Sequence, residues 1–135
     1  MPESRIAALR QLGQRVLGAL ERRDMAALTD CLDPDVRLHV LLPSGVRERS
    51  GQAAAVDTFA GWFADPADTI DVVQSSLEVL GDRLALSWRI RVASPGGADL
   101  VEQHLYATAG NRGLATLRLL CSGFLPETEM EGVLP

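Results

Sequence analysis

Residues 83–124 read RLALSWRIRVASPGGADLVEQHLYATAGNRGLATLRLLCSGF. Alternating apolar and polar residues fill three segments, and two glycine-containing turns, SPGGAD and GNRG, separate them. This pattern is typical of consecutive antiparallel β-hairpins. The segment TIDVVQSSLEVL, residues 69–80, adds a strand before the Gly81-Asp82 turn. We therefore predict a meander of four long strands, near residues 70–80, 83–93, 99–109 and 114–124.

The first half of the chain has the spacing of helices instead. Residues 5–22 carry an apolar stripe, and Asp24 can cap a short second helix. The alternating segment VRLHVLL, residues 36–42, predicts a strand, and PSGVRERSG after it predicts a turn. Ser50 can then cap a third helix, whose apolar face is formed by Val56, Phe59, Ala60 and Phe63.

This order of elements predicts an α+β fold. We expect three N-terminal helices packed in the concave face of a curved, mostly antiparallel sheet, because neither layer can bury its apolar face alone. Residues 1–125 should form a single domain, and the acidic residues 126–135 a flexible tail. A cone of this kind leaves room for a ligand between helices and sheet.

Composition excludes several classes of function. The chain has 135 residues and a net charge of −5, which argues against nucleic-acid or anionic-membrane partners. All 13 basic residues are Arg, so chemistry that needs a lysine is excluded. No apolar run reaches the roughly 18 residues of a membrane span. Cys31 and Cys121 are isolated, so we expect a cytoplasmic protein with reduced thiols, no bound metal and no cofactor.

Three segments together resemble the NTF2-like superfamily, which includes ketosteroid isomerases and SnoaL-like polyketide cyclases. They are LGALERRDMAALTDCLDPDVRLHV, RSGQAAAVDTFAGWF and EQHLYATAGNRGLATLRLLCSGF, in the family's order. The resemblance implies the cone-shaped fold. It also implies that the isomerases' proton-shuttling Asp corresponds to Val40 and their protonated Asp to Gln103. The base of the cyclases corresponds to Ser122 or Cys121, so the family's catalytic carboxylates are not matched.

Two histidines are the candidate catalytic residues, because imidazole transfers protons near neutral pH. His104 follows Gln103, and strand alternation turns only one of the two toward the cavity, with Glu102 on the side of His104. The register of this strand stays open. His39 either lines the cavity or sits in the core.

The candidate ligand-binding residues are Trp62, Trp88, Gln103, Arg118 and Ser122. The two tryptophans either frame a cavity or pack in the core. Arg118 shares a strand face with Ser122 and either meets an anion in the cavity or is solvated.

Two classes of function follow. In the first, an enzyme of isomerase or cyclase type binds a small, mostly apolar, carbonyl-bearing molecule and moves a proton. In the alternative, the domain binds a ligand without turnover or serves for dimerisation. The last strand carries apolar residues on both faces, Leu117, Leu119 and Cys121 against Leu120, so we also predict a homodimer.

Overall fold

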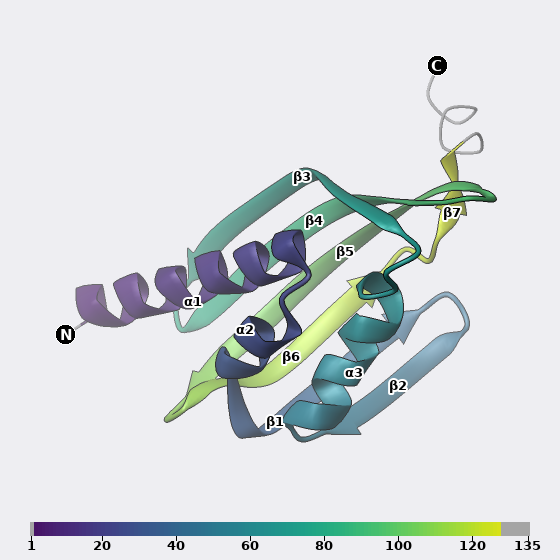
Figure 1. Cartoon of the computed structure of the whole chain (residues 1–135). Helices are drawn as coiled ribbons and strands as arrows, with labels where there is room; N and C mark the ends of the chain where they lie inside the picture. Colours follow the sequence, from purple (N-terminus) through teal and green to yellow (C-terminus); the bar gives the residue numbers. More distant parts are fainter. Residues whose placement is uncertain (1, 128–135) are drawn as a thin grey trace.

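The computed structural model describes residues 2–127, with three helices on one side of a seven-stranded sheet (Figure 1). The strands are β1 (Leu32–Leu42), β2 (Gly45–Ser50), β3 (Thr69–Leu80), β4 (Arg83–Ser94), β5 (Gly97–Gly110), β6 (Gly113–Cys121) and β7 (Leu125–Pro126). They lie in the order β2-β1-β6-β5-β4-β3, and β7 pairs with β5. Only the β1–β6 pair is parallel among the described strands. The predicted α+β class and the four-strand meander are confirmed.

The helices are α1 (Pro2–Arg22), α2 (Met25–Asp30) and α3 (Gln52–Phe63). In α1 the buried residues Leu9, Val16 and Leu20 form one stripe, which faces the sheet because their spacing repeats the helical period. Asp24 caps α2 as predicted: its carboxylate accepts a hydrogen bond from the Ala27 N–H at 3.0 Å.

The third helix, α3, follows the first strand as the sequence order predicted. Two details of the N-terminal half differ from the prediction. The segment expected to be a turn forms strand β2 instead, since Leu42 and Gly45 close a two-residue loop and residues 46–50 pair with β1. Ser50 does not cap α3; Gly51 takes the N-cap position and contributes no side-chain hydrogen bond.

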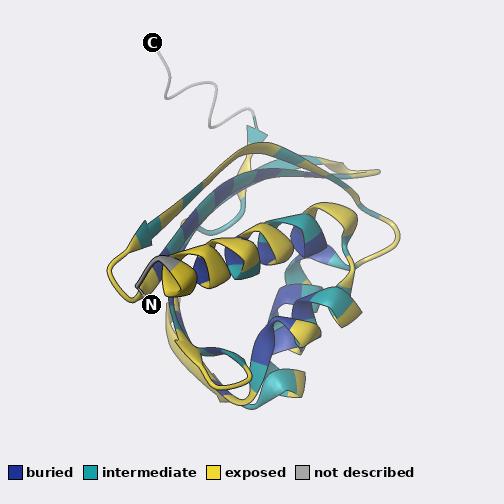
Figure 2. Ribbon diagram, turned by 90° about the vertical axis from the view of Figure 1, so that its left-hand side faces the viewer, coloured by how far each residue is buried: buried dark blue, intermediate teal, exposed yellow. Residues whose placement is uncertain are grey.

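The sheet curves around the helices, and the buried residues line its concave side (Figure 2). Alternation along β4 puts Leu84, Leu86, Trp88, Ile90 and Val92 inward, as the sequence predicted.

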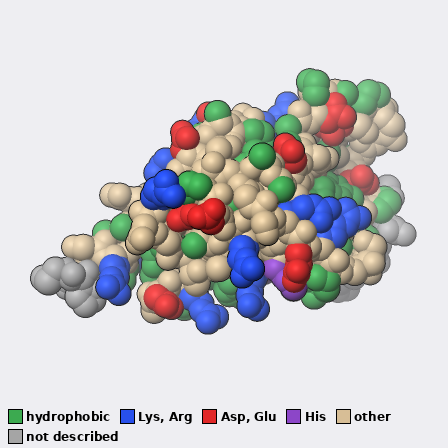
Figure 3. Space-filling view, turned by 90° about the horizontal axis from the view of Figure 1, so that it is seen from below, with side chains coloured by type: hydrophobic (Ala, Val, Ile, Leu, Met, Phe, Trp, Pro, Cys, Tyr) green, Lys and Arg blue, Asp and Glu red, His purple; other side chains and the backbone are tan. Residues whose placement is uncertain are grey.

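Of the predicted tail, Pro126 pairs with Asp99 and Glu127 pairs with Arg91, whereas residues 128–135 lie outside the described part. Arginine and acidic side chains are interspersed on the face seen from below (Figure 3).

Two glycines allow close approaches between elements. A Cβ atom on Gly13 of α1 would lie 2.7 Å from Cδ1 of Leu77 on β3. Gly113 begins β6 with φ +126°, and a Cβ atom there would lie 2.7 Å from the carbonyl oxygen of Cys31. The same oxygen accepts a hydrogen bond from the Leu114 N–H at 2.9 Å. Gly113 therefore lets the β5–β6 hairpin press against the start of β1.

Candidate functional site

A neutral polar network lies on the concave side of the sheet. Trp88, Gln103 and Cys121 are direct neighbours across β4, β5 and β6. The indole N–H of Trp88 donates to Oε1 of Gln103 at 2.8 Å, and Nε2 of Gln103 donates to Sγ of Cys121 at 3.2 Å. Gln103 is the only buried polar or charged residue in the described part of the chain. An amide can orient a ligand dipole but cannot shuttle a proton.

Four aromatic side chains pack beside this part of the sheet. Phe59, Trp62 and Phe63 come from α3, and Phe124 follows β6. Trp62 makes edge-on contacts with Phe59 and Phe63, at centroid distances of 5.5 and 6.1 Å, and Phe63 lies 6.3 Å from Phe124. Trp88, Phe59 and Phe63 are fully buried, whereas Trp62 is half-buried. Trp88 is thus a core residue, and Trp62 is the tryptophan that a ligand could reach.

Both histidines lie on the convex side. The side chain of His39 is 46% exposed, and its Nδ1 lies 3.1 Å from Oε1 of Glu48 on β2. Neither expectation for His39 holds, because Leu38 and Val40 take the inward positions of β1. His104 points outward because Gln103 points inward, which settles the register of this strand.

Glu102 connects His104 to β4. Its Oε2 lies 3.1 Å from Nε2 of His104, and its Oε1 accepts from Nη2 of Arg89 at 2.7 Å. Alternate residues of a strand are about 7 Å apart, but here the two side chains lean together. The hydrogen bonds from Arg89, and then from His104, lower the pKa of the Glu102 carboxyl from its usual value. A carboxylate held ionised in this way orients the imidazole on the outer surface.

Of the two alternatives for Arg118 the solvated one holds, and the predicted ligand-binding role of Ser122 in the cavity is wrong. Both are exposed on the convex side, because Leu117, Leu119 and Cys121 fill the inward positions of β6. The Ser122 hydroxyl accepts from the Glu102 N–H at 2.9 Å and donates to the Gly123 carbonyl at 2.8 Å. These bonds fix the chain where β6 ends.

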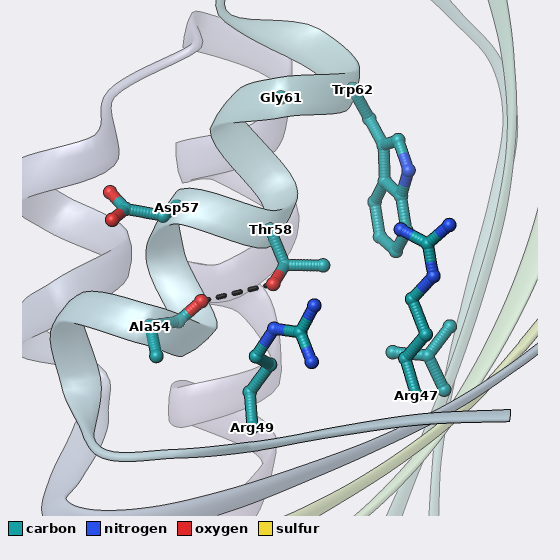
Figure 4. A pocket seen from close by; sticks show the side chains of 8 residues that line it. Arg47, Arg49, Ala54, Asp57, Thr58, Gly61 and Trp62 are labelled. Carbon is teal, nitrogen blue, oxygen red and sulfur yellow. Dashed lines mark hydrogen bonds between the residues drawn. The ribbon is translucent and has the colours of Figure 1, made fainter.

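A cleft of about 520 Å³ lies between β2 and α3 (Figure 4). Arg47 and Arg49 of β2 form one wall, and Thr58 and Trp62 of α3 form the other. Arg47 and the indole of Trp62 point toward one another, whereas the Asp57 carboxylate points away from both arginines. The cleft combines a flat aromatic surface with two guanidinium groups.

A second cleft, of about 1130 Å³, lies between α1 and the β3–β4 and β5–β6 turns. Its charged side chains are of both signs: Arg5, Arg15 and Arg112 with Asp30 and Asp82. Mixed charge of this kind favours no ligand class.

Reasoning from sequence missed Arg47 and Arg49. The signal was present: in VRERS the two arginines alternate with Glu48, so they share one face of a strand. The role of Cys121 as the sulfur partner of Gln103 was also missed, because nothing in the sequence places the two side by side.

The thiol of Cys31 is structural. It donates to the Ala27 carbonyl at 3.3 Å, and burial raises its pKa.

Within residues 2–127 no three His, Cys, Asp or Glu side chains come together as a metal site would require. None of the described helices is long and apolar enough to cross a membrane.

Comparison with solved structures shows the same fold at low sequence identity. A candidate polyketide cyclase from Xanthomonas campestris pv. campestris has a TM-score of 0.70 and 13% identity, covering 86% of this chain and 91% of its own. An NTF2-like protein of unknown function from Mesorhizobium loti has a TM-score of 0.67 and 18% identity, covering 88% and 94%. A candidate ketosteroid isomerase from Kribbella flavida has a TM-score of 0.62 and 16% identity, covering 94% and 87%.

The sequence of this chain matches no curated protein. It does match a family model over most of its length. The family described as SnoaL-like domain matches residues 14–119, from the middle of α1 to near the end of β6. The chain therefore belongs to the SnoaL-like domain family and shares its fold with solved NTF2-like proteins.

Proposed function

We propose that this domain binds a small, mostly apolar, carbonyl-bearing molecule and does not itself transfer protons. The ligand occupies the cleft between β2 and α3, with its apolar body against Trp62. Support comes from the volume of the cleft, about 520 Å³, which is within the range of small-molecule sites. The half-buried indole of Trp62 gives this ligand a flat apolar surface.

One observation supports the proposal that the domain does not transfer protons. The only buried polar side chain in residues 2–127 is the neutral amide of Gln103, and the Trp88 indole and the Cys121 thiol already bond it. Both histidines lie on the other side of the sheet, paired with Glu48 and Glu102. A ligand in the cleft therefore meets no imidazole, and the carboxylate of Asp57, which also lines the cleft, points away from Arg47 and Arg49 (Figure 4). General acid–base catalysis needs a proton-transferring group within hydrogen-bond reach of the ligand.

Binding without turnover is testable with a neutral aromatic probe and an isomerase assay. We expect 2-naphthamide to quench tryptophan fluorescence in the wild type and in Trp88→Phe, but not in Trp62→Phe, because only Trp62 lines the cleft. We also expect no isomerisation of a β,γ-unsaturated ketosteroid above the rate in buffer. Quenching that persists in Trp62→Phe would contradict the assigned cleft. Catalysis that disappears in His104→Gln would contradict the assigned mode of action.

A second proposal concerns self-association. Four large apolar side chains on the convex side of the sheet are about half exposed: Leu41 46%, Val46 55%, Tyr106 49% and Leu120 51%. Leu41 lies opposite both Val46 and Leu120, so the apolar surface runs across three strands. Charge pairs of both signs, His39–Glu48 and Arg89–Glu102, border it. A two-fold interface requires such a self-complementary surface, so we propose that a second copy of this chain covers it.

Substituting Leu120→Arg tests the dimer. We expect at least about a tenfold weaker self-association, because a charge replaces an apolar side chain within the proposed interface. Sedimentation velocity across a concentration series measures this. The matched control is Val73→Arg on edge strand β3, where the wild-type residue is 57% exposed. A monomeric wild type, or equal effects of both variants, would contradict the proposal.

A further inference from the structure

We propose that the cleft between β2 and α3 selects a ligand with an anionic end, such as an aromatic carboxylate or a stabilised enolate. This inference rests on the proposed ligand cleft and adds the charge of the ligand. Arg47 and Arg49 hold the anion, while the body of the ligand lies against Trp62.

The positions of the arginines carry the first part of the argument. In the β1–β2 pairing Arg47 lies opposite Val40 and Arg49 opposite Leu38, and both of these partners are buried on the concave side. The arginines therefore share the concave face of β2, and both extend along the cleft toward α3 (Figure 4). Two guanidinium groups on one face provide a fork of N–H donors that matches the two oxygens of a carboxylate.

Neither guanidinium has a carboxylate partner. The ion pairs in the described part of the chain involve Arg89, Arg91, His39 and His104, and none includes Arg47 or Arg49. Glu48 lies between the two arginines in sequence, but its side chain is paired with His39 on the other face. Asp57 lines the cleft, yet its carboxylate points away. The positive charge of the cleft is thus not neutralised by its own lining.

Hydrogen bonds within the lining leave the two guanidinium groups as the donors of the cleft. Nη1 of Arg49 donates to the Glu48 carbonyl at 2.8 Å, which restrains the guanidinium and leaves its other N–H groups free. The Thr58 hydroxyl donates to the Ala54 carbonyl at 2.9 Å, so it offers an acceptor and no free proton to the cleft. With Trp62 as a planar wall, these donors suit a flat anion better than a spherical one.

The experiment compares two ligands of nearly the same shape, one anionic and one neutral. We expect 2-naphthoate to bind the wild type about tenfold more tightly than 2-naphthamide, in isothermal titration at low salt. In the Arg47→Gln/Arg49→Gln variant this preference should vanish, while 2-naphthamide keeps its affinity. The matched control is Arg10→Gln/Arg37→Gln, which removes the same charge from two exposed sites outside the cleft and should keep the preference.

The outcomes separate this inference from the proposed function. Equal affinities for both ligands in the wild type would overturn the anion site and leave the cleft intact. Arg47 and Arg49 would then serve only as inward-pointing charges on edge strand β2, which prevent a strand of another chain from pairing with it. A preference lost equally in the control variant would overturn the site too, because net charge would explain it. Binding of neither ligand would contradict the proposed function itself.

Discussion

Replacing Gly113 by alanine is expected to lower the free energy of unfolding by about 4 kcal/mol, measured by urea denaturation. Two costs combine at this position. The backbone of Gly113 has φ +126°, which side chains with a Cβ rarely adopt, and the added Cβ would lie 2.7 Å from the Cys31 carbonyl oxygen. That oxygen belongs to backbone and also accepts the Leu114 N–H, so it cannot move away cheaply.

Gly45→Ala and Gly97→Ala separate the two costs. These glycines have similar backbone angles, φ +130° and +140°, and nothing lies within 4 Å of an added Cβ. We expect each control to lose about 1–2 kcal/mol from backbone strain alone. If Gly113→Ala were no more destabilised than the controls, the close approach of the β5–β6 hairpin to β1 would not constrain the fold.

Trp88→Ala is expected to destabilise the domain by a similar amount, about 4 kcal/mol. The side chain is 2% exposed, so its removal leaves a large cavity between the sheet and the helices. It also leaves Oε1 of Gln103 buried without its donor. Thermal and urea unfolding measure the loss. Trp62→Ala is the matched control and should cost about half as much, because Trp62 is only half-buried.

A double-mutant cycle isolates the hydrogen bond from the packing. Trp88→Phe and Gln103→Leu each leave one buried polar group without its partner, which costs about 1–3 kcal/mol. In the double variant neither group remains, so we expect it to be more stable than the sum of the single effects predicts, by about 1 kcal/mol. Strict additivity would mean that the Trp88–Gln103 bond contributes nothing.

The strands were predictable because their signal is local. Alternation along residues 83–93 is enough to place Trp88 inward, whatever the strand pairs with. The same rule applied to β6 gives two faces but not which one is inward, since Leu117 and Leu119 compete with Leu120. The cavity alternative for Arg118 depended on its shared face with Ser122, the residue that the resemblance matched to the base of the cyclases, and this transfer failed. In the β5–β6 pairing Arg118 lies opposite Tyr106, whose side chain also points outward.

The cleft could not be read from the sequence, because packing creates it. Arg47 and Arg49 face α3 only because β2 pairs with β1. A short segment of four polar residues, one glycine and one valine gives little indication of a strand. Trp62 joins them from a helix that begins after the hairpin. The composition showed which catalytic groups are absent, such as the lysine amine. It did not show which of the remaining polar side chains lie together in the fold.

The parallel pairing of β1 with β6 has a consequence for biosynthesis. Leu38 pairs with Leu117, so the central ladder of the sheet joins an early segment of the chain to nearly the last one. On the ribosome β1 and β2 are made long before β6 emerges, and until then one side of β1 has no partner. Such non-local pairing slows folding and exposes an apolar strand edge in the meantime. The nascent chain therefore completes its fold only once β6 has emerged, and ribosome-bound chains that stop before Gly113 should be clients of chaperones.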